Sequence, residues 1–178
     1  MLEAKENMVN TILYATDLGL YGPYMLEHVG DLARSHNAKV YVLHVIEPLG
    51  VFADAVLETF VPESSKENLR DHGLNEVMTA IRAKVRAVFD QDLHDYEGET
   101  DWLKDVHVIG GIPADVILTD AEAIRADLIV MGSHGGASDA ATPIGSVAAK
   151  VLQLSPIPVY LIPTSTHRSM NFGMASGL

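Results

Sequence analysis

The sequence has no cysteine and few aromatic residues, which make up 6% of its 178 residues. The lack of cysteine excludes disulfide bonds, cysteine-ligated zinc, iron–sulfur clusters and a thiol nucleophile. With 48% apolar and 20% charged residues, the composition is that of an ordinary globular domain. A chain of this length can bury a core without covalent or metal cross-links. We therefore expect one domain over residues 1–178.

Basic residues are also scarce, with 12 Lys and Arg against 24 Asp and Glu, and the formal net charge is −12. A chain so acidic, with no local Lys/Arg cluster, repels a phosphate backbone, so nucleic acid is not an expected partner. A small anion can still bind, because backbone N–H groups and helix N-termini attract it without a net positive protein.

Long hydrophobic runs are missing as well. No stretch approaches the roughly 18 apolar residues of a membrane span, and the first ten residues, MLEAKENMVN, mix acids and lysines without the apolar core of a signal peptide. The sequence therefore predicts a soluble cytoplasmic protein with no membrane partner.

Strand-like and helical segments alternate along the chain. The strand-like segments are short and apolar, as strands buried on both faces of a parallel sheet are, and they cover residues 11–16, 39–46, 105–109, 127–131 and 159–162. The helical segments repeat apolar residues every three or four positions, and they cover residues 21–35, 65–89, 113–125 and 146–153. This alternation predicts an α/β fold, an open parallel five-stranded sheet with helices on both faces. Ligands of such sheets bind beyond the carboxyl ends of the strands.

Three segments lie outside this pattern. Residues 47–64 form a long insertion with an apolar centre, VFADAVLETF, whose role the sequence leaves open. Residues 90–101 are acidic, and we expect a solvated loop there rather than a metal site. Residues 164–178 are expected to form a flexible tail around a core of about 10–163.

A glycine-rich loop follows the fourth predicted strand. Gly132 and Gly135 come directly after the strand, and Gly145 and Ser146 open the next helix nine residues later. Glycines let a ligand approach the backbone, and a helix N-terminus offers unpaired N–H groups and the positive end of its dipole. The spacing predicts a phosphate-binding loop. It is not a Walker A loop, because Gly-Lys-Ser/Thr is absent.

The Gly-x2-Gly-x9-Gly-Ser spacing, within MGSHGGASDAATPIGSVAAKVL, resembles the ATP-binding branch of the universal stress protein family. The segments NTILYATDLG, VLHVIEP, GIPADVIL and SPIPVYLIP resemble other parts of that family in the same order. The resemblance covers about residues 10–163. It implies an adenine-nucleotide-binding stress-response or regulatory protein, with ATP, ADP or AMP as ligand, with or without Mg²⁺, and at most a slow ATP hydrolysis.

The resemblance also implies which residues contact the nucleotide. Asp17 matches the family's aspartate near the ribose, and the backbone of Ala15 and Val45 matches positions beside the adenine. Gly132 matches a position by the ribose and first phosphate. The complete implied set is Ala15, Thr16, Asp17, Val45, Met131, Gly132, Gly135, Gly145, Ser146 and Val147. No catalytic or metal-ligating residue is implied.

One departure from the family concerns charge. Relatives often carry a basic residue between the second and third glycines, whereas GASDAATPI has none and contains Asp139. This lowers the expected affinity for a triphosphate. A bound Mg²⁺ would compensate, or the ligand would carry fewer charges, as AMP and ADP do.

Structural explanations compete with these assignments. Asp17 is also suited to capping a turn, and His44 and His107 are better explained as sheet histidines with satisfied hydrogen bonds than as metal ligands. His134 needs no catalytic role, and no Gly-x-Ser-x-Gly elbow supports a hydrolase. The alternatives to nucleotide binding are an interaction module of the same family that binds no nucleotide and, last, a true enzyme.

The last predicted strand, residues 159–162, has prolines on both sides and is typical of a sheet edge. An exposed edge has unpaired backbone groups. Members of the family commonly pair through this strand, so the resemblance implies a homodimer formed there.

Overall fold

The computed structural model describes residues 9–19, 21–47, 74–96, 98–135 and 144–164. In chain order its elements are β1 (Thr11–Ala15), α1 (Gly22–His36), β2 (Lys39–Ile46), α4 (Leu74–Asp95), β3 (Leu103–Gly110), α5 (Pro113–Ala123), β4 (Leu128–Gly132), α6 (Ser146–Leu154) and β5 (Val159–Ile162). No helix within these residues is long and apolar enough to cross a membrane.

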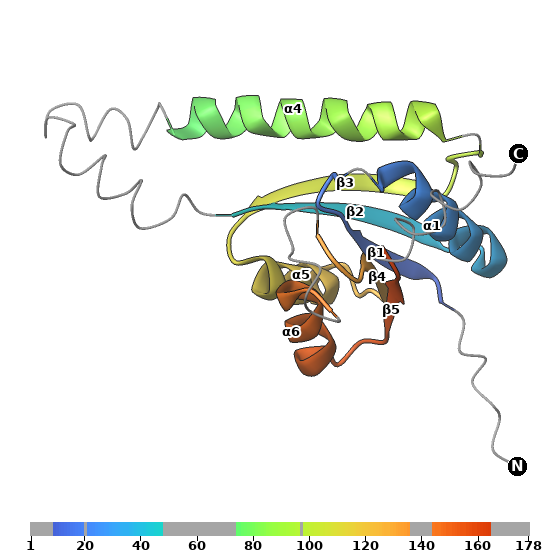
Figure 1. Ribbon diagram of the computed structural model, residues 1–178. Helices are drawn as coiled ribbons and strands as arrows, with labels where there is room; N and C mark the ends of the chain where they lie inside the picture. The colour runs from blue at the N-terminus through green and yellow to red at the C-terminus, as the bar shows by residue number, and fades with distance from the viewer. Residues whose placement is uncertain (1–8, 20, 48–73, 97, 136–143, 165–178) are drawn as a thin grey trace, which may run out of the picture.

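The five strands form one parallel sheet in the order β3-β2-β1-β4-β5. Helices α1 and α4 cover one face, and α5 and α6 cover the other (Figure 1). The predicted fold class is therefore confirmed. The chain builds outward from β1 to β2 and β3 on one side, and then to β4 and β5 on the other. Strand order thus reverses between β1 and β4, which is where open sheets of this kind place their ligands.

Alternating side chains of β1 divide between the two cores. Ile12 and Tyr14 pack toward α1 and α4, whereas Leu13 and Ala15 pack toward α5 and α6. All four are buried. A central strand with apolar residues on both faces needs helices on both, which explains the continuous apolar run in its sequence.

The helix before β3 differs from the prediction. It continues to Asp95, six residues past the expected end at Phe89, so the first half of the predicted acidic loop at 90–101 is helical and that prediction is wrong there. The reason is that Val85, Phe89 and Leu93 recur every four residues along one stripe of the helix: Val85 is buried, and Phe89 and Leu93 pack in the core with α1 and the sheet. Burial of this stripe outweighs the acidic residues between. Residues 65–73 of the predicted helix lie outside the described part of the chain.

Other predicted elements differ less from the structure, or fall outside the described residues. Strand β3 is longer than the predicted 105–109, while β2 and β5 keep the predicted bounds. The insertion at 48–64 is not described. Thr164, expected to begin the flexible tail, is buried at 4% exposure and hydrogen-bonded to the loop after β4. The rest of the predicted tail, 165–178, is outside the description.

Candidate functional site

A pocket of about 550 Å³ opens at the carboxyl ends of the strands, beside β1 and β4, where the strand order reverses. All ten residues assigned from the sequence line it: Ala15, Thr16, Asp17, Val45, Met131, Gly132, Gly135, Gly145, Ser146 and Val147. They come from the ends of three strands and the start of α6. The fold thus brings together residues separated by up to 132 positions in the chain.

The chain turns sharply after β1. The N–H of Gly19 donates to Asp17 Oδ1 at 3.0 Å, and the N–H of Leu18 donates to Thr16 Oγ1 at 3.1 Å. The turn-capping interpretation of Asp17 is thereby confirmed, and the same carboxylate lines the pocket. Between them, Leu18 has a left-handed φ of 57°. That conformation is costly for a leucine, and such strain concentrates at functional sites.

The glycine loop is held by residues on either side of it. The N–H of Ser133 donates to the carbonyl of Ile162 at 2.8 Å, and the N–H of Gly145 donates to the carbonyl of Ser133 at 2.8 Å. A Cβ built on Gly145 would lie 3.3 Å from that Ser133 oxygen. The two ends of the loop therefore lie against each other, and a glycine suits position 145 because of this close approach.

Thr164 joins the loop to the end of β5. Its hydroxyl accepts from the N–H of His134 and donates to the carbonyl of His134, each at 3.1 Å. Its own N–H donates to Ser133 Oγ at 3.0 Å. Because Ser133 and Thr164 are both buried, these bonds are shielded from water. Sequence reasoning missed both residues, since nothing in the pattern pairs a serine after one strand with a threonine after another.

Helix α6 begins at the pocket. Its N-cap is Gly145, which has an extended conformation and no side chain to accept the first N–H groups of the helix. Ser146 and Val147, at the start of the helix, line the pocket. Among the described residues, the end of α6 at the pocket therefore has no side-chain cap, and its N–H groups and positive dipole favour an anion.

Aromatic and apolar side chains from both faces of the sheet also line the pocket. They include Tyr14, Tyr21 and Met25 on the α1 side and Ile117 on α5, none of which the sequence reasoning had assigned to the site. Burial raises the pKa of the Tyr14 hydroxyl above its usual range, while its hydrogen bond to Thr16 opposes the shift. Tyr14 therefore stays neutral at physiological pH. A pocket with aromatic and apolar side chains and a helix start among its lining suits a ligand with a flat base and a phosphate.

His44 and His107, the two histidines of the predicted strands, have hydrogen-bond partners within the protein. His44, which lines the pocket, donates from Nδ1 to the carbonyl of Thr16 at 2.9 Å. His107 bonds the buried Asp120 through Nδ1 at 2.8 Å. Both are the satisfied sheet histidines that the sequence predicts. Within the described residues, no cluster of three His, Asp or Glu side chains is arranged to hold a metal ion.

These features define a doubly wound α/β protein with a ligand pocket at the reversal of its strand order. The chain belongs to the universal stress protein family, because the model of that family matches residues 8–163.

Individual relatives agree with this assignment. A universal stress protein of Thermus aquaticus, named for its place in the QAH/OAS sulfhydrylase 3′ region, is 30% identical over 87% of this chain and 99% of its own length. The solved structure of protein MJ0577, from Methanocaldococcus jannaschii, is 27% identical with a TM-score of 0.63, covering 88% of this chain and 96% of that one. A universal stress protein solved in complex with cAMP is 20% identical with a TM-score of 0.54, covering 88% and 98%. At that identity the likeness concerns the fold.

Proposed function

We propose that this universal stress protein binds an adenine nucleotide in the pocket at the carboxyl ends of β1 and β4, and acts as a stress-response or regulatory protein through that binding. The observation that carries the proposal is the convergence of all ten assigned residues on one pocket that includes the start of α6. The cAMP complex of a structural relative supports a nucleotide as the class of ligand.

The pocket suggests how the nucleotide lies. The phosphate would meet the N–H groups at the start of α6, near Ser146 and Val147, and Asp17 would accept hydrogen bonds from the ribose hydroxyls. The adenine would lie against the backbone near Ala15 and Val45. ATP, ADP and AMP share these features, and Mg²⁺ would enter with the phosphates rather than through a preformed cluster of protein ligands.

The first experiment identifies the ligand. Freshly purified protein is denatured with acid, the supernatant is analysed by ion-exchange chromatography, and nucleotide-free protein is then titrated calorimetrically with adenine nucleotides. We expect released adenine nucleotide and measurable heat of binding. Gly145→Val should abolish the heat, because its side chain would press on Ser133 and His134 where the loop closes. Gly145→Ala, with one added carbon, should bind more weakly than wild type yet better than Gly145→Val.

Absence of both nucleotide and heat would favour the alternative, an interaction module that works without nucleotide. Tyr160 gives that alternative an observable basis, because it is a large aromatic residue on β5 and is exposed.

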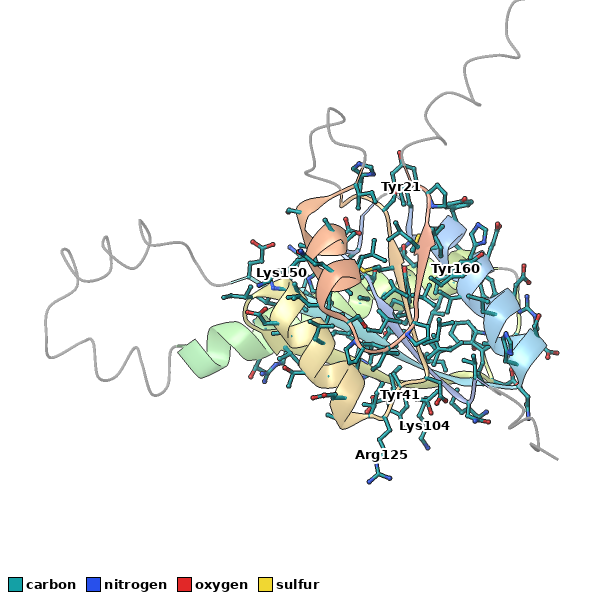
Figure 2. The ribbon with its side chains drawn as sticks, turned by 90° about the horizontal axis from the view of Figure 1, so that it is seen from below. Tyr21, Tyr41, Lys104, Arg125, Lys150 and Tyr160 are labelled. Atoms are coloured by element: carbon teal, nitrogen blue, oxygen red, sulfur yellow. The ribbon has the colours of Figure 1, made fainter. Side chains whose placement is uncertain are left out.

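We propose further that the protein is a homodimer through β5. Within the part of the chain that the structure describes, this strand pairs only with β4 and is therefore a sheet edge. Tyr160 lies along this edge and is 41% exposed (Figure 2). A second copy would cover such an edge. Leu161→Pro should convert the dimer to a monomer in sedimentation experiments. Leu161→Ala, which shortens the side chain but keeps the backbone N–H, is the control and should stay dimeric; a monomeric wild type would overturn the interface.

A further inference from the structure

Helix α4 has an outer face that no other described element covers. Val85 and Phe89 are buried, and Ala87, two residues from each of them, lies on the opposite side of the helix. Ala80, Ala83 and Ala87 recur along this outer face at helical spacing, and all three are exposed. The helix lies along the outside of the molecule, and its N-terminal end reaches beyond the strands (Figure 1). The outer face is therefore open to a partner.

Charged side chains flank this outer face in a regular order. Arg86 and Asp90 lie four residues apart along one side of it. Lys84 and Asp95 lie eleven residues, or about three turns, apart along the other side. On both sides the basic residue precedes the acidic one. All four side chains are exposed, and within the described residues none of them forms an ion pair, so their charges are available to a partner.

We propose that the outer face of α4 binds the same face of a second copy of this chain, with the two helices antiparallel. In such a pair around a twofold axis, each side of the helix meets the same side of its partner with the residue order reversed. Arg86 would then lie opposite Asp90 of the partner subunit, and Lys84 opposite Asp95 of the partner subunit. A parallel pair would instead place like charges together. Both ion pairs are centred within three residues of Ala87, whose small side chain lets the helices approach closely.

The charge and the fold both favour this place for a second copy. With a net charge of −12, two copies repel each other in most orientations, so self-association needs a contact that brings opposite charges together. Helix α4 packs on α1 and β3, and β3 lies at the other end of the sheet from β5. Pairing through α4 therefore does not depend on the proposed pairing through β5. Where both form, two twofold contacts would link dimers into larger assemblies.

Cysteine cross-linking tests the pairing, because the chain has no cysteine of its own. Ala87→Cys would bring two thiols together near the twofold axis, and a disulfide needs Cα atoms about 4.4–6.8 Å apart. Glu122→Cys, at an exposed position on α5, is the matched control. Under mild oxidation we expect Ala87→Cys to form covalent dimers about tenfold faster than Glu122→Cys or better, because pairing raises the local concentration of thiols. Equal rates would indicate random collision and would overturn the proposal.

Charge reversal in the Ala87→Cys protein tests the antiparallel register. Arg86→Glu would place a carboxylate opposite Asp90 of the partner subunit, so we expect the cross-linking rate to fall several-fold. Adding Asp90→Arg exchanges the two charges, restores opposite pairs and should recover the rate. A rate that stays unchanged in both variants, or that the exchange does not recover, would mean that this face meets a different protein or none.

Discussion

The two faces of the sheet are packed with residues of different size. The face beneath α1 and α4 buries Tyr14, Phe89 and Trp102. The face beneath α5 and α6 buries no aromatic residue in the described part of the chain and instead contains five alanines, which are Ala15, Ala114, Ala121, Ala126 and Ala148.

This difference bears on where the pocket forms. Small residues let α5 and α6 lie close to the sheet, and at its carboxyl end Ala15 and Ala148 line the pocket. The large side chains on the other face contribute more buried apolar area and hence more stability. We therefore expect substitutions on the α1/α4 face away from the pocket to change mainly stability, and substitutions on the α5/α6 face near the pocket to change ligand binding as well.

Removal of Phe89 should have the largest effect. Its side chain is 2% exposed in the core between α4 and the sheet, so Phe89→Ala should lower the free energy of unfolding by about 3–5 kcal/mol. Chemical denaturation measures the loss. Val88→Ala, at the neighbouring and 39% exposed position, is the control and should cost far less. Nucleotide affinity of the folded Phe89→Ala protein should be unchanged, and its loss would break the proposed separation of the two faces.

A larger side chain on the α5/α6 side of the pocket should lower both stability and nucleotide affinity. Ala148 is buried in the first turn of α6 and lines the pocket, so Ala148→Leu should cost about 1–3 kcal/mol of stability through overpacking. It should also weaken nucleotide binding more than tenfold, by analogy with other steric blocks. Ala149→Leu, on the exposed side of the same turn, should do neither. Unchanged affinity in Ala148→Leu would place the ligand elsewhere.

The sequence predicts the sheet well because its strands carry strong local signals. Residues of β1, β2 and β4 are apolar on both sides, and the glycine spacing marks the loop that closes the pocket. The end of α4 was not predicted because Leu93 is stabilised by packing against α1 and the sheet. A local acidic sequence gives no sign of such a tertiary contact. The role of Thr164 could not be predicted for the same reason, since its hydrogen-bond partners are 30 and 31 residues away in the sequence.

Thr164 lets the connection between the glycine loop and β5 be tested. Thr164→Val keeps the shape of the side chain and removes the hydroxyl that bonds the N–H and carbonyl of His134. We expect a loss of about 1–3 kcal/mol, because these polar groups and Ser133 Oγ lose a shielded partner. Thr164→Ser retains the hydroxyl and should recover most of both stability and nucleotide affinity. A Thr164→Val protein as stable as wild type would show that the loop is held by its other bonds alone.

The smallest expected effect comes from Asp92, on the α1/α4 face. Burial, and secondly the nearby Asp95, raises the pKa of the Asp92 carboxyl. Because the folded-state pKa lies above the unfolded one, the folded protein holds more protons between the two values, and stability falls as pH rises through that interval. Above the folded-state pKa of Asp92, the full loss of stability caused by burying its charged carboxylate is present. Asp92→Asn should therefore be more stable than wild type at pH 7, by about a few tenths of a kcal/mol given solvent screening.

Denaturation of wild type and Asp92→Asn at pH 7 and near pH 3 measures this contribution. The gain should be present at pH 7 and should vanish near pH 3, where the carboxyl is protonated in both states. Asp90→Asn, which removes the same charge at an exposed position of the same helix, is the control. The Asp92 carboxylate also lies beside Gly22, at the start of α1, whose dipole favours a negative charge. A less stable Asp92→Asn at pH 7 would mean that attraction to the α1 dipole exceeds the cost of burial.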